Sequence, residues 1–193
     1  AGGRSIVSAE PAKSLATGAP LTEETWADFV QRLRHHCKGE GVRDHCTANA
    51  IFLVQARTIV FGIDKDYTDN IAVIFEDSHW LTPQAYWGDA DQDQRDDLDA
   101  TAQEDGHADF LSMPLYDQWD VLGELDDHTV TGWSEEWEYV NSHFTKEAAE
   151  AFIARKQHDY RKGLRVYVDA QLYCWEFEAI KEAILAGQLT LTK

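Results

Sequence analysis

Near the start of the chain, apolar residues recur at intervals of three and four, which is the spacing of one face of a helix. Thr22 is placed to cap this helix, and Gly39 is placed to end it. The apolar face consists of Trp26, Phe29, Val30, Leu33 and Cys37. This pattern predicts an amphipathic helix between Thr22 and Gly39.

Several segments have the composition of strands. Residues 50–62 are rich in β-branched and aromatic side chains and are apolar on both faces, which predicts a central strand or a bent pair of strands. Residues 64–70 are typical of a turn, and residues 71–75 of the next strand. Residues 129–144 interleave aromatic and acidic side chains, which predicts a long strand.

The second half of the chain adds helices to this pattern. A helical stripe after Pro114 predicts a helix within residues 110–125, and Thr145 is placed to cap a helix that starts at Lys146. A strand is predicted over residues 164–169, and a last helix over about residues 172–186, before Gly187. We therefore predict an α+β fold, a largely antiparallel sheet that helices cover on one face.

The middle of the chain contains few large apolar side chains that a core could bury. Residues 82–109 are mostly Asp, Gln, Gly, Ala and Thr, which favours a solvated loop or a weak surface helix. We therefore expect a single domain over residues 21–193, with an acidic surface insert at about 82–109. Residues 1–20 are expected to be a poorly ordered lead-in or a remnant of expression.

Net charge limits the class of partner. The chain has 17 basic and 35 acidic side chains, a formal charge of −18. This balance argues against direct contact with nucleic acid or with an anionic membrane, and it favours a partner with a basic surface. Within residues 88–109 only Arg95 opposes the acids Asp89, Asp91, Asp93, Asp96, Asp97, Asp99, Glu104, Asp105 and Asp109.

The density of these acids is close to that of nucleic acid. Duplex DNA carries one charge per about 1.7 Å of axis. A helix rises about 1.5 Å per residue, so six aspartates between Asp89 and Asp99 would span roughly 15 Å. The segment could therefore compete with nucleic acid for a basic groove.

Cysteine usage and hydropathy indicate the compartment. Three widely separated cysteines do not form the paired spacing of a disulfide framework, so free thiols are expected. No apolar run approaches the roughly 20 residues that span a bilayer. We expect a soluble protein in the cytoplasm.

Two segments contain metal-ligand types without the required spacing. Residues 89–99 begin like a calcium loop, but Gln94 stands where the turn needs glycine and Ala100 where a bidentate glutamate closes the cage. A second group contains imidazoles and thiols whose spacing does not match a zinc finger: His35, His36, Cys37, His45 and Cys46. We predict neither a metal nor a cofactor.

An enzymatic alternative rests on a few side chains. Two carboxylates in different environments can hold different pKa values, so acids near a histidine could serve as acid and base. The candidate residues are Glu135, Glu136, Glu138, His143 and His158. The competing interpretation is an edge strand with a wet, charged face, and phosphate loops, nucleophile elbows and His-Glu-x-x-His pairs are absent from the sequence.

Four phrases carry a resemblance: His45-Cys-Thr-Ala-Asn-Ala-Ile-Phe-Leu-Val-Gln55, Phe144-Thr-Lys-Glu-Ala-Ala-Glu-Ala-Phe-Ile153, His158, and Arg165-Val-Tyr-Val-Asp169. They resemble a group of short, uncharacterised proteins of tailed bacteriophages and prophages, over roughly residues 43–80 and 130–185. The resemblance implies no activity and no functional residue. It implies a context, because small phage products are often accessory or anti-defence factors that bind a host protein.

These observations lead to a hypothesis about function. We expect a non-enzymatic acidic phage accessory protein in the host cytoplasm that binds and inhibits or redirects a basic host protein, such as a nucleic-acid-binding defence protein. Its contact residues would be the six aspartates Asp89, Asp91, Asp93, Asp96, Asp97 and Asp99, with Trp87 and Trp133 as aromatic anchors. The alternatives are a small enzyme or ligand-binding domain at the His/Glu site and a self-associating structural protein.

Overall fold

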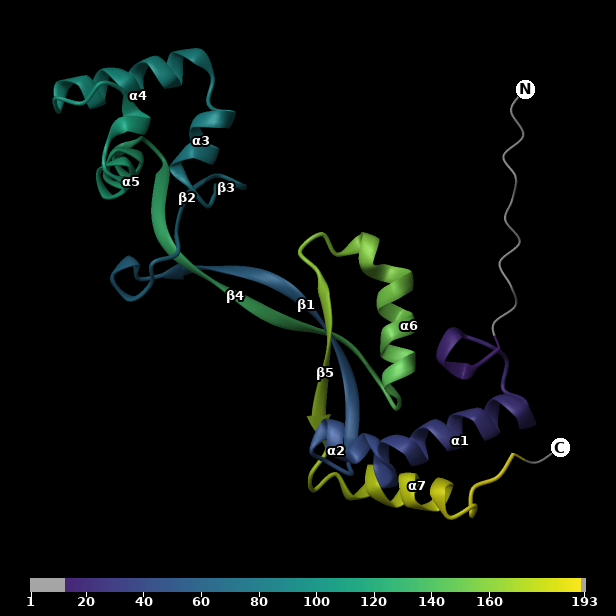
Figure 1. Cartoon of the computed structure of the whole chain (residues 1–193). Coiled ribbons are helices and arrows are strands. Elements are labelled where there is room, and N and C mark those ends of the chain that lie inside the picture. Colours follow the sequence, from purple (N-terminus) through teal and green to yellow (C-terminus); the bar gives the residue numbers. More distant parts are fainter. Residues whose placement is uncertain (1–12, 192–193) are drawn as a thin grey trace, which may run out of the picture. The chain divides into compact units, whose positions relative to one another are not determined.

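A computed structural model describes residues 13–191, which form seven α-helices, several 3₁₀ turns and a five-stranded sheet. The strand order is β3-β2-β4-β1-β5, and the β1–β5, β2–β3 and β2–β4 pairs are antiparallel. The predicted α+β fold with a largely antiparallel sheet is therefore confirmed. Figure 1 shows the elements in chain order.

The chain divides into two compact units rather than one continuous core. Residues 1–57 and 137–193 form the terminal unit, and Thr58–Glu136 form the middle unit. Two strands have residues in both units, β1 (Ala50–Ile63) and β4 (His128–His143). The single domain that the sequence pattern predicts over residues 21–193 stays a prediction.

The terminal unit buries one face of its strands against a helix. Side chains alternate along a strand, so Phe52 and Val54 of β1 are fully buried while the intervening residues point to the other face. In β5 (Leu164–Ala170), Val168 lies opposite Phe52. The helix α6 (Lys146–Lys156) contributes the buried Ala149 to the same core, and Figure 1 shows it running beside β5.

Two further helices of the terminal unit share a smaller core. Thr22 caps α1 (Glu23–Lys38) through reciprocal hydrogen bonds with Thr25, as the sequence predicts. Leu33 of α1 packs with Ile184 and Leu185 of α7 (Trp175–Leu185). A short helix, α2 (Gly41–His45), lies between α1 and β1 and has no counterpart in the predicted elements.

The predicted lead-in is only partly tested. Residues 1–12 lie outside the described residues. Residues 13–20, expected to be poorly ordered, instead form a 3₁₀ turn, η1 (Leu15–Thr17), and the Ser14 hydroxyl donates to Asp28 of α1 at 2.6 Å. This hydrogen bond attaches the segment to α1, and Ala19 is buried. The poorly ordered lead-in itself stays a prediction.

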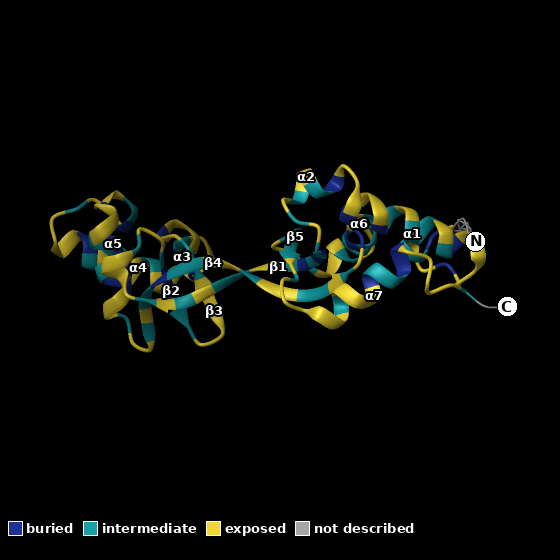
Figure 2. Cartoon of the chain, turned by 90° about the horizontal axis from the view of Figure 1, so that it is seen from below, coloured by how far each residue is buried: buried dark blue, intermediate teal, exposed yellow. Residues whose placement is uncertain are grey.

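The middle unit has a core of its own. Its strands are the predicted β2 (Ile71–Phe75) and the short β3 (Ser78–Trp80), and its helices are α3 (Pro83–Asp89), α4 (Gln92–Glu104) and α5 (Leu115–Glu124). A 3₁₀ turn, η3 (Phe110–Ser112), precedes α5. Large buried side chains of this core come from β2, α4, η3 and α5: Val73, Leu98, Phe110, Trp119 and Leu122. Figure 2 shows the alternation of buried and exposed positions along these helices.

The acidic insert predicted at 82–109 is therefore not confirmed as a solvated loop or weak surface helix. The segment forms α3 and α4, and it contributes Tyr86, Ala90, Leu98 and Ala102 to the core. Tyr86 and Ala90 are four positions apart, as are Leu98 and Ala102, so the two members of each pair lie on the same side. Asp91 caps α4 by accepting a hydrogen bond from the Gln94 amide at 2.9 Å.

The middle unit also offers a test of its packing. In Gly132→Ala, the new Cβ would overlap Cγ2 of Thr68 and lie 2.8 Å from the Ile63 carbonyl oxygen. We expect this variant to lower the free energy of unfolding by about 1–3 kcal/mol in urea titrations. The matched control is Gly88→Ala in α3, where nothing lies within 4 Å and helix propensity should raise stability by about 0.5–1 kcal/mol. Equal effects of the two variants would contradict the packing.

Candidate functional site

The excess negative charge lies entirely in the middle unit. Of the 35 acidic residues, 21 lie between Thr58 and Glu136, where only Lys65 and Arg95 are basic, so this unit has a formal charge of −19. The terminal unit has 15 basic and 14 acidic residues, a formal charge of +1. The acidic character of this chain therefore belongs to one compact module and is not spread over the whole molecule.

The six aspartates proposed as partner contacts have different environments. Asp89 accepts from the Trp80 indole nitrogen at 2.8 Å, and Asp99 accepts from the Phe110 amide at 2.9 Å. Asp91 caps α4, so these three residues also stabilise the fold. Asp93, Asp96 and Asp97 are exposed residues of α4. Within the described residues, the one hydrogen bond to their carboxylates is donated by the Gln92 side chain to Asp96. These last three are the carboxylates of the group that are most available to a partner.

The two tryptophans predicted as anchors are half-buried. Trp87 stacks on Phe110 with ring centroids 5.8 Å apart, and Arg95 lies 5.9 Å from its ring. Trp133 donates from its indole nitrogen to the Ile71 carbonyl at 3.2 Å. Both rings therefore serve the packing of the middle unit, which leaves less of their surface for a partner.

A pocket in the middle unit gathers both acids and exposed aromatic rings. It encloses about 390 Å³, and we call it the acidic-aromatic pocket. Beside it, Tyr116 is 66 % and Leu115 62 % exposed at the start of α5, and Tyr67 of the turn η2 (Lys65–Tyr67) is 85 % exposed. Its lining consists of Lys65, Asp66, Thr68, Asp69, Ile71, Leu115, Tyr116, Trp119, Asp120 and Val130.

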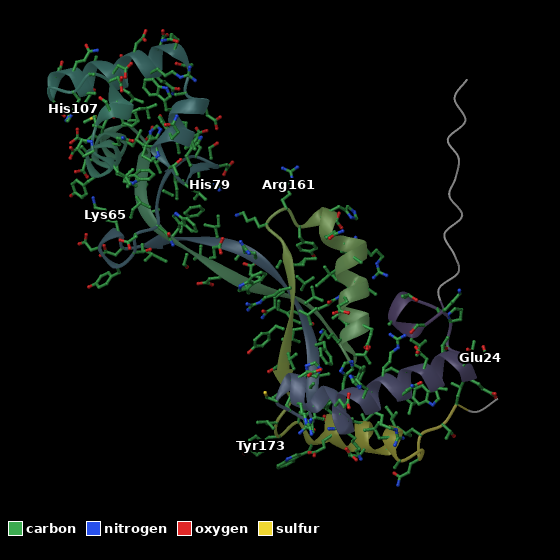
Figure 3. All side chains as sticks on the ribbon, viewed as in Figure 1. Glu24, Lys65, His79, His107, Arg161 and Tyr173 are labelled. Carbon is green, nitrogen blue, oxygen red and sulfur yellow. The ribbon has the colours of Figure 1, made fainter. Side chains whose placement is uncertain are left out.

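The sole basic side chain of this pocket shows how it can hold a cation. The Lys65 ammonium lies 3.6 Å from an Asp120 carboxylate oxygen and 5.8 Å from the centroid of the Tyr116 ring. Lys65 is itself nearly half exposed, so these contacts contribute little to stability. The same carboxylates and ring can receive a lysine or arginine of another protein. Figure 3 labels Lys65 on the turn that carries it.

The terminal unit contains a buried chain of ionisable groups. His36 of α1 is 2 % exposed; its Nδ1 lies 3.0 Å from Nε2 of His45, and its Nε2 lies 3.0 Å from a Glu147 oxygen. Burial opposes ionisation of Glu147, but the hydrogen bonds from His36 and from its own backbone amide, together with the charges of His36 and Arg32, outweigh burial and lower the pKa of this carboxyl. With Glu147 ionised, His36 donates to it, and His45 in turn donates to His36.

This chain of hydrogen bonds accepts only one further proton. If both imidazoles were charged, two N–H groups would face each other across 3.0 Å. Burial, and then the charge of His36, accordingly lower the pKa of His45. Phe52 packs against both rings, with centroids 4.8 and 4.9 Å away. The chain of bonds joins α1, α2 and α6, so its role is to fix these elements on the core.

The residues of the predicted His/Glu site do not form this group. Glu135 and Glu136 belong to the middle unit, whereas Glu138 and His143 belong to the terminal unit. His143 contacts the Asn141 side-chain oxygen at 2.9 Å, and burial lowers its pKa. His158 lies in the 3₁₀ turn η4 (Gln157–Asp159), where it pairs with its neighbour Asp159 at 3.1 Å. The sequence suggested no pairing of His36, His45 and Glu147, because Glu147 is 111 positions from His36.

The comparisons with known proteins give no further guide to the site. The chain matches no family model, no curated protein and no solved structure. Among residues 13–191, no group of three or more His, Cys, Asp or Glu side chains is arranged to hold a metal ion. In the same part of the chain, no helix combines the length and the apolar character needed to cross a membrane.

The histidine chain predicts a dependence of stability on pH. The folded protein resists protonation of His45, whereas the unfolded chain takes up that proton near the ordinary pKa of 6.5. We therefore expect the free energy of unfolding to fall as the pH decreases below about 6.5. Urea titrations at several pH values measure this slope. In His45→Gln, the glutamine amide can still donate to His36, but the titrating imidazole is gone, so the free energy of unfolding should depend less steeply on pH. Burial also lowers the pKa of His143, and the pH dependence that His143 contributes should remain.

His158→Gln is the matched control, because His158 is exposed and pairs only at the surface. It should keep the wild-type slope. An unchanged slope in His45→Gln would contradict the assigned role of the histidine chain.

Proposed function

We propose that the protein is an acidic binding protein whose middle unit attaches to the basic surface of another protein. The observation that carries the proposal is the confinement of the −19 charge to one folded module that also exposes an aromatic pocket. Proteins that bind DNA or RNA carry basic surfaces that contact phosphate groups, and an acidic module can occupy such a surface. The proposed partner is therefore a protein that itself binds DNA or RNA. The proposed setting is the cytoplasm of a bacterial host, where a phage-type accessory protein would inhibit or redirect such a protein.

Two parts of the middle unit would contribute differently to binding. Exposed carboxylates such as those of α4 attract a cationic surface over a distance and so raise the rate of association. Rings at the centre of an interface exclude water and slow dissociation. Tyr116, Tyr67 and Leu115 supply that apolar contact, and Asp66, Asp69 and Asp120 surround it.

The proposal is tested by capture of partners on the immobilised protein. A bacterial lysate is treated with nuclease, applied at moderate salt, and the retained proteins are identified by mass. The control column carries the Asp66→Asn, Asp69→Asn, Asp120→Asn variant, which removes the acids of the acidic-aromatic pocket. Wild type should enrich basic, nucleic-acid-binding proteins that the variant releases. Identical sets on the two columns would overturn the proposal.

The exposed acids of α4 should act on the rate of association. In the variant Asp93→Asn, Asp96→Asn, Asp97→Asn, we expect association with the captured partner to slow by about tenfold at low salt, with little change in dissociation. Surface plasmon resonance at several salt concentrations measures both rates. The variant should also show a weaker dependence on salt. A faster dissociation with an unchanged association rate would contradict the assigned steering role.

The exposed ring of Tyr116 should act on the lifetime of the complex. Tyr116→Ala removes an anchor, so we expect dissociation to become about tenfold faster or more while association changes little. Trp175→Ala is the matched control, since Trp175 is a similarly exposed aromatic residue of the terminal unit. The same resonance measurement compares them, and equal effects of the two variants would place the contact elsewhere.

A further inference from the structure

The terminal unit has a sheet face whose chemistry is the counterpart of the acidic-aromatic pocket. Val166 and Val168 of β5 pack with α6, so the alternating Arg165 and Tyr167 lie on the opposite face. Gln55 of β1 lies directly across from Arg165 and accepts from its Nε at 2.9 Å. Tyr167 is 47 % exposed there. We call this surface, made of Gln55, Arg57, Trp137, Arg165 and Tyr167, the arginine-tryptophan face.

Two guanidinium groups are held on this face by one indole ring. The Arg165 guanidinium lies 4.2 Å from the centroid of the Trp137 ring, and that of Arg57 lies 5.3 Å from it. Arg165 also lies 5.5 Å from the Tyr167 ring. Stacking on aromatic rings fixes a planar guanidinium, and Arg165, whose Nε already donates to Gln55, has further N–H groups that can donate to a carboxylate.

Further basic residues lie beside this face. The Arg57 amide donates to the Gly163 carbonyl at 3.1 Å, which brings β1 next to the turn that carries Arg161 and Lys162. Figure 3 shows Arg161 pointing outward from that turn. Between positions 155 and 165 the sequence has five basic residues and a single acid, Asp159, which already pairs with Lys156 at 2.8 Å. This end of the terminal unit is therefore cationic.

The composition of the face favours a protein over a nucleic acid. Tryptophan, tyrosine and arginine are the side chains enriched at the centres of protein interfaces. A nucleic-acid strand would need ring surface on which its bases can stack. Here guanidinium groups lie over the Trp137 ring, which leaves less of its surface for a base.

We infer that the arginine-tryptophan face binds the middle unit of a second copy of this chain at the acidic-aromatic pocket. Both surfaces combine aromatic side chains with charged groups, and the prevailing signs are opposite. Arg165, with the neighbouring Arg161 and Lys162, outnumbers Asp169 on one surface, whereas Asp66, Asp69 and Asp120 are opposed only by Lys65 on the other. Planar guanidinium groups form paired hydrogen bonds with carboxylates, which gives the contact direction as well as attraction. The inference rests on the proposed function, because it uses the same pocket and names one partner for it.

Such a contact joins two different surfaces and so leaves one of each free. Heterologous contacts continue into rings or open chains instead of stopping at a dimer. The association should therefore grow with protein concentration and weaken with salt, since the attraction is between exposed charges. A basic partner bound at the acidic-aromatic pocket would compete with it and release the copies from one another.

Two charge-reversal variants test the inference. One carries Arg161→Glu and Arg165→Glu on the terminal unit, and the other Asp69→Arg and Asp120→Arg on the middle unit. Sedimentation velocity of wild type should show species larger than 21.9 kDa at about 50 mM salt that dissociate at about 500 mM. Each variant alone should be monomeric, with association weakened by at least about tenfold. Circular dichroism checks that both are folded.

The decisive measurement is an equimolar mixture of the two variants. Each retains one intact surface, so the mixture should associate at low salt although neither variant associates alone. A mixture that stays monomeric, or a wild type that stays monomeric at low salt, would overturn the inference. Arg161→Glu with Lys162→Glu, which leaves the stack on Trp137 in place, should repeat the result and guards against a local folding defect.

Two further readouts separate the possible failures. The Arg161→Glu, Arg165→Glu variant keeps its middle unit intact, so it should still retain basic proteins from lysate. If the protein retains such partners but wild type does not self-associate, this inference is overturned and the proposed function stands. Fluorescence anisotropy with a labelled single-stranded oligonucleotide tests the other class of ligand. Oligonucleotide binding by wild type that is lost in this variant would assign the face to nucleic acid and overturn the inference.

Discussion

Mutual repulsion among the carboxylates of the middle unit is the constraint on which the structure depends. A formal charge of −19 between Thr58 and Glu136 opposes compaction. It is offset by a continuous apolar core in which Leu98 of α4 and Phe110 pack with Val73 and Leu122. Some of the acids also stabilise the fold locally, as Asp91 does at the start of α4 and Asp99 at the Phe110 amide. A surface of this charge is thereby held on a folded scaffold, where its carboxylates keep definite positions.

The terminal unit has nearly balanced charge, and its stability depends on how it buries polar side chains. It buries polar groups only with partners: Lys181 donates to the Ala48 carbonyl and the Asn49 side chain, and His36 lies between His45 and Glu147. These contacts join helices to the start of β1. Its two stacked arginines are meanwhile kept at the surface by Trp137. The middle unit carries exposed carboxylates, and one face of the terminal unit carries arginines on aromatic rings. Both proposals depend on this separation of charge, because carboxylates attract basic groups and arginines attract acidic ones.

Much of the secondary structure followed from local patterns. The spacing of Leu33 and Cys37, the cap at Thr22 and the β-branched run of β1 each act over a few residues, so the chain itself specifies them. The acidic surface insert predicted at residues 82–109 is not confirmed, because the few apolar residues of this segment pack into a core. Tyr86, Ala90, Leu98 and Ala102 are helical in spacing, yet only the neighbouring Phe110 and Trp119 make them a core. The start of α7 also lies three residues later than the composition indicates.

What the sequence by itself determined is the α+β class, the long strands and the excess of acidic charge, because these depend on composition and on neighbours within a few positions. Tertiary structure alone decided how the charge is used. It confines the acids to one unit, packs Trp87 and Trp133 inward while leaving Tyr116 exposed, and brings Arg165 onto Trp137 and Glu147 onto His36. Such contacts join residues tens of positions or more apart in the chain. Their formation depends on which strands and helices pack together, which no local pattern of side chains encodes.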